Sequence, residues 1–323
     1  MKKIAVVGAG AMGAVLGAFL QKGGGDVILV DPYREHMDRI RERGLILNSA
    51  DKEPEVVKMK TAYDAENIGV MDYVIIMVKG YLTREALTGA QKAIGDHTFV
   101  CSFQNGLGNV EVLEEFVNKD KILYGCLNMA SILRAPGEVY GNLFDEVNVH
   151  IGSVVKDEEQ RRAGEELAQM FTRGGANSVY QENIEYHVWS KAMVNIVVNP
   201  TCALVRLRGA EAGRNMHFQQ IVLRLVQETL AVAKAKGVEG LDFNTFFTKV
   251  LPAAKKSAGD HYPSMAQDVM MAKRPTEIDY LNGAIVKMGK ELGIETPVNE
   301  TITNLIKTIE ANYDKQYYPE KVS

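Results

Sequence analysis

The sequence predicts an α/β protein in which a doubly wound parallel sheet is followed by an all-α domain. In the first half of the chain, short β-branched runs alternate with helical segments, which is typical of parallel βαβ units. In the second half, strand patterns are rare and helical periodicity dominates. A glycine-rich turn joins the first expected strand to the first expected helix. We therefore assign residues 1–181 to an N-terminal sheet domain and residues 182–323 to a C-terminal helical domain.

Each expected strand is a β-branched or aromatic run bounded by turn residues, and each expected helix has helical periodicity. Asn199 precedes Pro200, where the first helix of the second domain is expected to end or kink. Gly237 and Gly293 are expected to follow helix ends, where glycine adopts the left-handed conformation. Strands are expected at 2–8, 26–31, 72–79, 97–103, 121–127, 138–141, 146–154 and 177–181, and helices at 11–22, 34–43, 83–94, 108–117, 157–175, 183–199, 218–237, 245–256, 276–293 and 299–313.

The composition is that of a globular protein, with 323 residues, 46% of them hydrophobic, and a net charge of -4. This length allows two domains that each bury a core. A nucleic-acid partner would need a basic face, which the charge does not indicate. The cysteines, Cys101, Cys126 and Cys202, form no Cys-x-x-Cys pair, so we expect no metal site and interpret them as small core hydrophobes, with a catalytic thiol as the lesser alternative.

The N-terminus, MKKIAVVGAGAMG, could be a signal peptide or a buried strand with a glycine turn and a helix. The glycine spacing favours the second interpretation. Elsewhere no apolar run of about 18 residues lacks a glycine, so we expect no transmembrane helix and a cytoplasmic protein. The apolar helices of the second domain could serve a homodimer or the domain's own core, and both alternatives stay open.

Three glycines, Gly8, Gly10 and Gly13, form the pattern G-x-G-x-x-G between the first strand and the first helix. The first glycine allows a tight turn, the second lets a pyrophosphate approach the backbone, and the third lets the helix pack on the strand. The helix N-terminus then offers N–H groups and a positive dipole end to the phosphates. This context predicts a Rossmann-type dinucleotide site rather than an unrelated glycine turn. Its cofactor-binding residues would be Gly8, Ala9, Gly10, Ala11, Met12 and Gly13.

Asp31 ends the second expected strand, where an acidic residue accepts hydrogen bonds from the ribose hydroxyls of NAD. A carboxylate there would repel the 2′-phosphate of NADP, so we expect a preference for NADH. Arg34 follows closely and could weaken that preference. Asp31 could also act as the N-cap of a helix whose first residue is Pro32, and both roles could coexist.

Lys79 and Asn105 follow two further buried strands. Ligands of a doubly wound sheet bind beyond the carboxyl ends of its strands, so both side chains could meet cofactor or substrate. A solvated lysine and an Asn-Gly turn are the alternatives.

A polar stripe interrupts the apolar segment VWSKAMVNIVVNP, because Lys191, Asn195 and Asn199 follow one another at intervals of four residues. This spacing places them on one helix face. A lysine that reaches solvent from the helix edge is the alternative. A second polar group, Ser264, Gln267, Asp268, Glu277 and Asp279, surrounds the expected helix start at 276, where acidic residues are also common for electrostatic reasons.

These motifs, in their order and spacing over nearly the whole chain, resemble those of the ketopantoate reductases (2-dehydropantoate 2-reductases). The motifs are GAGAMG, VKG, QNGLGN, WSKAMVNIVVNP, SMAQD and TEIDYLNG. The resemblance implies that Lys191 is the general acid and that Glu277 is the carboxylate that anchors the substrate near the cofactor. It also implies substrate binding by Asn105, Asn195, Asn199 and Ser264, and cofactor contacts at Lys79, Asn105 and Ala130.

The activity that this resemblance implies is the NAD(P)H-dependent reduction of 2-dehydropantoate to pantoate in pantothenate biosynthesis. Hydride transfer to the keto carbon creates an alkoxide, which a positioned ammonium can stabilise and protonate. The family's usual cofactor is NADPH, whereas Asp31 favours NADH. The motifs are also similar to those of NADH-dependent D-2-hydroxyacid dehydrogenases of the D-mandelate type. A dinucleotide sensor without turnover is a weaker alternative, because a sensor has no use for a proton donor.

One segment departs from the family pattern. The stretch between SMAQD and TEID is one residue longer than usual. The extra residue leaves the alignment of Ser264 open, whereas that of Glu277 is more secure.

Overall fold

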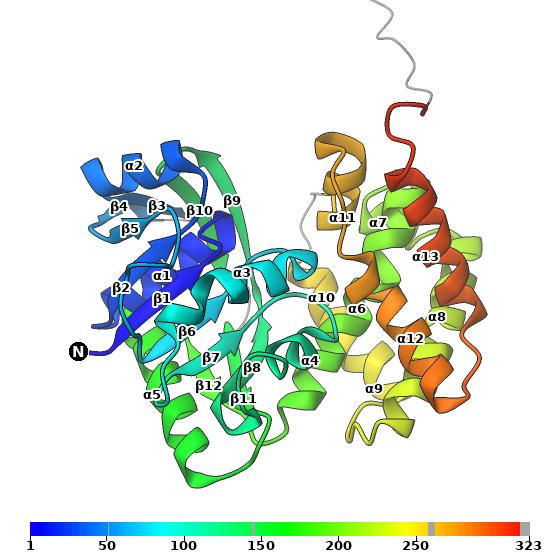
Figure 1. Cartoon of the computed structure of the whole chain (residues 1–323). Coiled ribbons are helices and arrows are strands. Elements are labelled where there is room, and N and C mark those ends of the chain that lie inside the picture. The colour runs from blue at the N-terminus through cyan, green and yellow to red at the C-terminus, as the bar shows by residue number, and fades with distance from the viewer. Residues whose placement is uncertain (51, 144–145, 258–261, 317–323) are drawn as a thin grey trace, which may run out of the picture. The chain divides into compact units, whose positions relative to one another are not determined.

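The computed structural model describes residues 1–50, 52–143, 146–257 and 262–316. It divides into two compact units, which we call the sheet unit (residues 1–104 and 108–187) and the helical unit (residues 105–107 and 188–323). Figure 1 labels the helices and strands of both units. This combination of a mainly parallel sheet and a helical unit confirms the predicted fold class.

The sheet unit contains an eight-stranded sheet with the order β12-β11-β8-β7-β6-β1-β2-β5. Six of these strands are parallel to one another, whereas β11 is antiparallel to β8, and β12 is parallel to β11. Between β8 and β11 the described residues form two further strands and no crossover helix, so no described helix imposes a parallel return. The eight strands are β1 (Lys3–Val7), β2 (Asp26–Val30), β5 (Lys60–Ala62), β6 (Tyr73–Ile76), β7 (Phe99–Ser102), β8 (Ile122–Leu127), β11 (Val149–Ser153) and β12 (Ser178–Tyr180).

A smaller four-stranded sheet, ordered β4-β3-β10-β9, was predicted only in its strand β10. Its strands are β3 (Leu45–Ser49), β4 (Lys52–Val57), β9 (Met129–Ala135) and β10 (Glu138–Leu143). Most of β4 is exposed and polar, so it lacks the apolar pattern of a buried strand. The small sheet contacts α1, and a side chain at Gly141 would meet Val15 at 3.0 Å.

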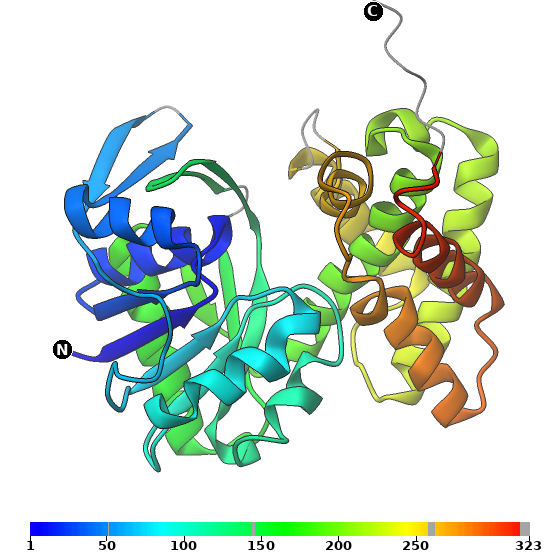
Figure 2. The same ribbon diagram turned by 45° about the horizontal axis from the view of Figure 1, so that its top comes forward.

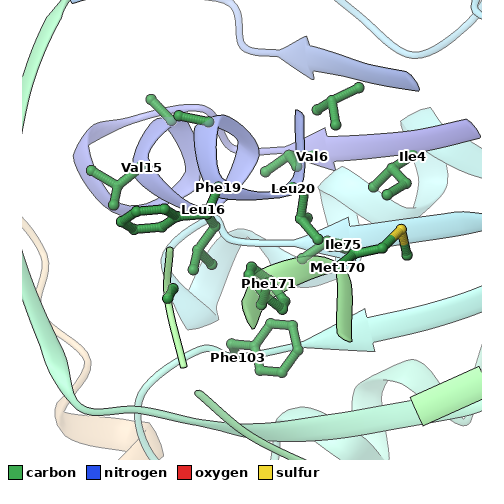
Figure 3. Packing of buried hydrophobic residues seen from close by; sticks show 14 of the residues in the cluster. Ile4, Val6, Val15, Leu16, Phe19, Leu20, Ile75, Phe103, Met170 and Phe171 are labelled. Carbon is green, nitrogen blue, oxygen red and sulfur yellow. The ribbon is translucent and has the colours of Figure 1, made fainter. Parts of the chain in front are cut away.

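Helices cover both faces of the larger sheet. On one face, α1 (Ala11–Lys22) and α5 (Glu158–Gly174) share a core with the strands, and on the other α3 (Thr83–Ala90) and α4 (Asn109–Leu113) form a second core. Figure 2 shows α3 in front of the strands and α5 behind them. Side chains of α1, α5 and the strands interdigitate in the first core (Figure 3). The remaining elements of this unit are α2 (Arg34–Arg43) and the 3₁₀ turns η1 (Gly80–Leu82), η2 (Gln91–Ala93) and η3 (Lys119–Lys121).

Two glycines allow α1 and α5 to approach closely. A Cβ atom at Gly23 would lie 1.9 Å from the carbonyl oxygen of Met170, and one at Gly174 would lie 1.8 Å from that of Phe19. No larger residue fits either position without moving a backbone. This contact fixes α1, and with it the turn that precedes α1, on the sheet.

The helical unit is built around α6 (Ile184–Val205), which begins in the sheet unit. Its first turn packs on β11, where Ile184 contacts Gly152 and the ring of His187 stacks on that of His150 with centroids 4.1 Å apart. The boundary between the two units therefore falls between residues 187 and 188, inside the helix. The domain boundary at 181/182 stays a prediction.

The other helical elements of this unit follow α6 along the chain. They are α7 (Gly209–Ala212), α8 (Met216–Ala235), α9 (Phe243–Thr245), the π-helix η4 (Phe246–Val250), α10 (Leu251–Ser257), α11 (Ser264–Gln267), the π-helix η5 (Asp268–Ala272), the 3₁₀ turn η6 (Ile278–Tyr280), α12 (Asn282–Leu292) and α13 (Pro297–Glu310). The predicted glycines follow α8 and α12, with φ angles of 80° at Gly237 and 68° at Gly293. The helix expected at 276–293 is instead divided at Leu281, between η6 and α12.

The prediction that α6 would end or kink at Pro200 was wrong about its end, because the helix continues to Val205. By length and composition α6 could also cross a membrane, although 67% of its most apolar window is buried within the protein. Met193, Ile196 and Val197 pack in the core of the helical unit. A buried core helix accounts for this composition, and one such helix is weak evidence for a membrane span.

Candidate active site

The glycine turn between β1 and α1 has the geometry that a dinucleotide requires. Gly8 has a φ angle of 95°, and its Cβ would lie 2.5 Å from the backbone nitrogen of Val78. A Cβ at Gly13 would lie 2.0 Å from the carbonyl oxygen of Gly8. A Cβ at Gly10 would meet nothing within 4 Å. The first and third glycines are therefore required by the protein's own packing, whereas the space at the second is left for a ligand.

The N-terminus of α1 lies next to this space. Gly10 is its N-cap and provides no side chain to accept hydrogen bonds from the first turn. The turn is held in place from behind, because the N–H groups of Gly8 and Ala9 donate to the carbonyl oxygen of Val30 on β2. Ala11 and Met12 are the first residues of the helix, so their N–H groups have no partner within it and lie at the positive end of its dipole. These features fit the pyrophosphate of a nicotinamide dinucleotide.

Asp31 follows β2 and accepts a hydrogen bond from the N–H of Tyr33 at 2.9 Å. Tyr33, and not Asp31, is the N-cap of α2, so the alternative that Asp31 caps a helix beginning at Pro32 was wrong. A carboxylate has about four lone-pair sites, and this turn leaves capacity for a ribose diol.

Two arginines of α2 contact the Tyr63 ring. The guanidinium of Arg34, on the first turn, lies 4.3 Å from the ring centre, and that of Arg41 lies 5.0 Å from it. The Tyr63 hydroxyl donates to Asp38 at 2.5 Å. Cation–π contacts of this kind hold a guanidinium in a preferred place. Two arginines are thus ordered around Tyr63, which directly follows β5, the strand that pairs with β2.

Sequence reasoning missed His36, a fully buried residue of α2. Its Nδ1 accepts a hydrogen bond from the N–H of Gly137 at 2.8 Å. Burial lowers the pKa of His36, whereas the charge of Asp31 and the carbonyl of Ala9 act in the opposite direction. The ring therefore bonds to the turn between β9 and β10, and its Nε2 has no hydrogen-bond partner among the residues that the structure describes. The sequence around His36, REHMDR, shows only helical periodicity and so gives no indication of this contact.

Lys79 follows β6, is partly buried, and caps the 3₁₀ turn η1. Gln104 supports this loop from the end of β7, because its amide donates to the carbonyl oxygen of Val78 at 2.7 Å and to the hydroxyl of Thr83 at 2.8 Å. Gln104 was not among the predicted site residues. Ala130 lies on β9 of the small sheet, opposite Asn142 of β10, and its contact with a cofactor stays a prediction.

In the helical unit, the polar stripe of α6 meets two of the predicted partners. Asn195 donates to Oδ1 of Asn105 at 3.5 Å, and Asn199 donates to the hydroxyl of Ser264 at 3.3 Å. Both stripe asparagines are buried, with 9% and 8% of their surface exposed. Lys191 is partly buried and lies one helical turn before Asn195 on the same face. Four of the residues proposed to bind substrate are therefore brought together in two pairs.

The segment that carries Asn105 is held against η6. The N–H of Leu107 donates to the carbonyl oxygen of Tyr280 at 2.7 Å. Gly106 has a φ angle of 92°, and its Cβ would lie 2.2 Å from that oxygen. The Asn-Gly pair therefore forms the expected turn, and the same turn presents Asn105 to α6.

Glu277 is the N-cap of η6 and is buried, with 8% of its surface exposed. Its carbonyl oxygen accepts from the N–H of Tyr280 at 3.0 Å, and the preceding N–H, of Thr276, donates to Glu310 at 2.7 Å. These bonds fix the backbone that carries the carboxylate. Glu277 and Lys191 belong to the same unit.

The π-helix η5 overlaps the stretch that is expected to be one residue longer than the family pattern. A π-helical turn holds more residues than an α-helical turn and so can accommodate an extra residue. The segment ends in Lys273, which has a φ angle of 49°, and the guanidinium of Arg274 pairs with the buried carboxylate of Asp268 at 2.5 Å. Ser264 precedes this irregularity and accepts a hydrogen bond from Asn199, and its role in substrate binding stays a prediction.

The arrangement combines an ammonium, four amide or hydroxyl groups and a carboxylate in one unit, and a dinucleotide cradle in the other. Amides and a hydroxyl can bind the carboxylate of a small acid, and an ammonium can stabilise and protonate an oxyanion. Among the described residues, no group of three or more His, Cys, Asp or Glu side chains could hold a metal ion.

Comparison with known proteins identifies both parts of the chain. The family models described as "Ketopantoate reductase PanE/ApbA" and its C-terminal domain match residues 4–155 and 183–310. A 2-dehydropantoate 2-reductase of Lactococcus lactis is 32% identical over 310 residues, which are 95% of this chain and 98% of that protein.

Solved structures show the same resemblance. The ternary structure of D-mandelate dehydrogenase with NADH and anilino(oxo)acetate has a TM-score of 0.86 and 31% identity, over 97% of this chain and 100% of the other. A PanE/ApbA family ketopantoate reductase from Ralstonia eutropha has a TM-score of 0.85 and 26% identity, over 97% of this chain and 100% of the other.

Proposed function

The chain belongs to the ketopantoate reductase family, and on this basis we propose that it reduces 2-dehydropantoate to pantoate with a nicotinamide cofactor. The observation that carries the proposal is the pairing of Asn195 with Asn105 and of Asn199 with Ser264 on the helix face that also bears Lys191. A polar face of this kind suits a small 2-keto acid. The enzyme would belong to pantothenate biosynthesis.

In the proposed reaction, the reduced nicotinamide supplies a hydride to the keto carbon. Lys191 stabilises the negative charge that develops on the keto oxygen and donates a proton to it. Asn105, Asn195, Asn199 and Ser264 bind the polar groups of the substrate, and Glu277 anchors it. The glycine turn, Asp31, Lys79 and Ala130 would hold the cofactor.

NADH is proposed as the preferred cofactor. Asp31 has room to bind the ribose diol and would repel a 2′-phosphate. Arg34 and Arg41 lie around Tyr63, directly after the neighbouring strand β5, and would reduce this repulsion, so NADPH would also be used. The NADH complex of D-mandelate dehydrogenase is a relative with the same reduced cofactor.

A second candidate is a D-2-hydroxyacid dehydrogenase of the D-mandelate type. The TM-score of 0.86 to the complex of D-mandelate dehydrogenase with NADH and anilino(oxo)acetate favours it, as does Asp31. The two candidates differ in the side chain of the substrate, which a few contacts of the pocket decide.

The test is the loss of absorbance at 340 nm with NADH or NADPH and a panel of 2-keto acids. We expect the largest kcat/KM with 2-dehydropantoate and NADH. A larger value with an aromatic 2-keto acid would favour the second candidate. Cofactor binding without turnover of any acid in the panel would contradict both and favour a dinucleotide sensor.

The enzyme is proposed to be cytoplasmic, with a small 2-keto acid as its partner and with neither nucleic acid nor membrane. The two oligomeric states that we consider are a homodimer and a monomer. Light scattering of the purified protein distinguishes the dimer from the monomer.

A further inference from the structure

A proline inside α6 leaves one carbonyl group of the helix without its usual partner. Pro200 has no N–H, so the carbonyl oxygen of Ile196, four residues earlier, loses the hydrogen bond that it would accept in a regular helix. Ile196 is fully buried, and water cannot readily replace that bond. The affected carbonyl lies between Asn195 and Asn199 of the polar stripe.

A side chain from another helix occupies this position. The amide nitrogen of Asn282, the first residue of α12, donates to the carbonyl oxygen of Ile196 at 3.3 Å and to Oδ1 of Asn299 at 3.0 Å. Asn282 is fully buried, and its own oxygen has no hydrogen-bond partner among the residues that the structure describes. Burying an oxygen without a hydrogen bond is unfavourable. The fold accepts this cost because the nitrogen of Asn282 makes both bonds, to Ile196 and to Asn299.

The orientation of this amide is set by a carboxylate. Glu228 on α8 accepts hydrogen bonds from the side-chain nitrogen of Asn299 at 2.7 Å and from the N–H groups of Asn299 and Val298 at 2.9 Å each. A carboxylate only accepts, so the nitrogen of Asn299 must face Glu228 and its oxygen must face Asn282. That oxygen in turn requires the nitrogen of Asn282. The same nitrogen reaches Ile196.

The bond from Asn282 joins two segments that carry the chemistry proposed above. Asn282 follows Glu277 through the 3₁₀ turn η6, whose backbone bonds keep the connection short. Ile196 is adjacent to Asn195 and lies on the helix that carries Lys191. A third segment joins them, because Leu107 bonds to Tyr280 of η6.

We propose that Asn282, oriented by Asn299 and Glu228, is a positioning residue that binds the carbonyl left open by Pro200 and so sets the place of Glu277 relative to Lys191 and Asn195. This inference rests on the proposed function, because it assigns the purpose of the bond to the alignment of that site. Asn282 itself contacts neither substrate nor cofactor in this assignment. It acts through the helix and the turn that it joins.

The test is a double-mutant cycle of Asn282→Ala and Pro200→Ala. Asn282→Ala removes the donor and should lower kcat roughly tenfold to a hundredfold, as expected when reacting groups are displaced. The KM for NADH should stay within about twofold, since the glycine turn is unchanged. Pro200→Ala restores an N–H that can bond to Ile196, so it should recover most of the lost stability in the double variant. It should not recover the lost kcat, because an N–H on α6 does not join this helix to the segment that carries Glu277. Pro200→Ala alone should keep kcat within about twofold of the wild type.

Two further measurements and a control variant separate positioning from a merely structural role. With NADH deuterated at the transferred position, the isotope effect on kcat should rise in Asn282→Ala and stay raised in the double variant. Thermal unfolding establishes that each variant is folded at the assay temperature. Asn304→Ala, which changes an exposed asparagine of α13, is the matched control and should alter none of these values.

Two results would overturn the proposal. One is a wild-type kcat in Asn282→Ala, and the other is a double variant whose kcat returns to that of the wild type, because a satisfied carbonyl of Ile196 would then be sufficient without the bond between the two segments. If Asn282→Ala does not fold, Asn282→Asp keeps the shape, replaces the donor nitrogen with oxygen, and enters the same cycle. If the wild type reduces no 2-keto acid, the proposed function fails. The double-mutant cycle is then measured on the free energy of unfolding. An absence of coupling between the two substitutions in that free energy would contradict the bond itself.

Discussion

The glycine turn and the polar stripe are built in opposite ways. The turn consists of six consecutive residues, 8–13, and its shape comes from the backbone and from missing side chains. The stripe consists of side chains on α6 that meet residues far away in the chain, since Asn195 and Asn105 are 90 positions apart and Asn199 and Ser264 are 65 apart. A local motif can be recognised in the sequence alone. A distributed site depends on how the helical unit folds.

This difference predicts two kinds of failure. A change in the turn should weaken cofactor binding because it alters the space for the pyrophosphate. A change in the stripe should impair the chemical step or substrate binding and leave the cofactor bound. Each of the following variants can sharpen this separation or break it.

The largest expected effect is that of Lys191→Ala. Loss of the proton donor should lower kcat by roughly 10² or more, the range typical for a general acid. NADH binding, measured by fluorescence titration, should be unchanged, because the glycine turn is intact. A kcat close to that of the wild type would remove Lys191 from the mechanism.

In the glycine turn, Gly10→Ala should separate binding from folding. Its Cβ meets nothing within 4 Å, so the thermal unfolding temperature should stay the same, while the Kd for NADH should rise about tenfold or more. Gly13→Ala places a Cβ 2.0 Å from a carbonyl oxygen and should lower both the stability and the affinity. Gly89→Ala, at an exposed site of α3 with open space, is the control. Equal losses of stability in Gly10→Ala and Gly13→Ala would contradict the distinction.

Asp31→Asn tests the ribose end of the same site. Removing the negative charge should raise the ratio of kcat/KM for NADPH to that for NADH by roughly tenfold, because the repulsion of the 2′-phosphate disappears. Turnover at saturating NADH should change little. An unchanged ratio would show that the ordered arginines around Tyr63 decide the preference instead.

The smallest effect is expected for Ser264→Ala. Losing one neutral hydrogen bond of about 0.5–1.5 kcal/mol should raise the KM for the 2-keto acid about twofold to tenfold. The KM for NADH should not move. A change confined to NADH kinetics would place Ser264 outside the substrate site.

Sequence patterns predicted elements whose periodicity reflects burial, and missed those that tertiary contacts stabilise. The strands of the larger sheet that were expected from β-branched runs all occur. By contrast, β4 is mostly exposed and polar, and it forms because β3 provides an edge for pairing. The continuation of α6 beyond Pro200 was also missed, since the donor that binds the open carbonyl of Ile196 comes from Asn282.

The sequence by itself determined the dinucleotide turn, because a glycine pattern between a strand and a helix has one compact shape and one use for its open space. It also placed Lys191, Asn195 and Asn199 on one face, because helix geometry depends only on spacing. Only the tertiary structure decided what that face meets. Asn105 reaches α6 from a turn that is hydrogen-bonded to Tyr280, and Ser264 reaches it from a segment that contains a π-helix. No local rule specifies either contact. The physical reason is that backbone geometry is set by neighbours in the chain, whereas side-chain pairs depend on packing across the whole unit.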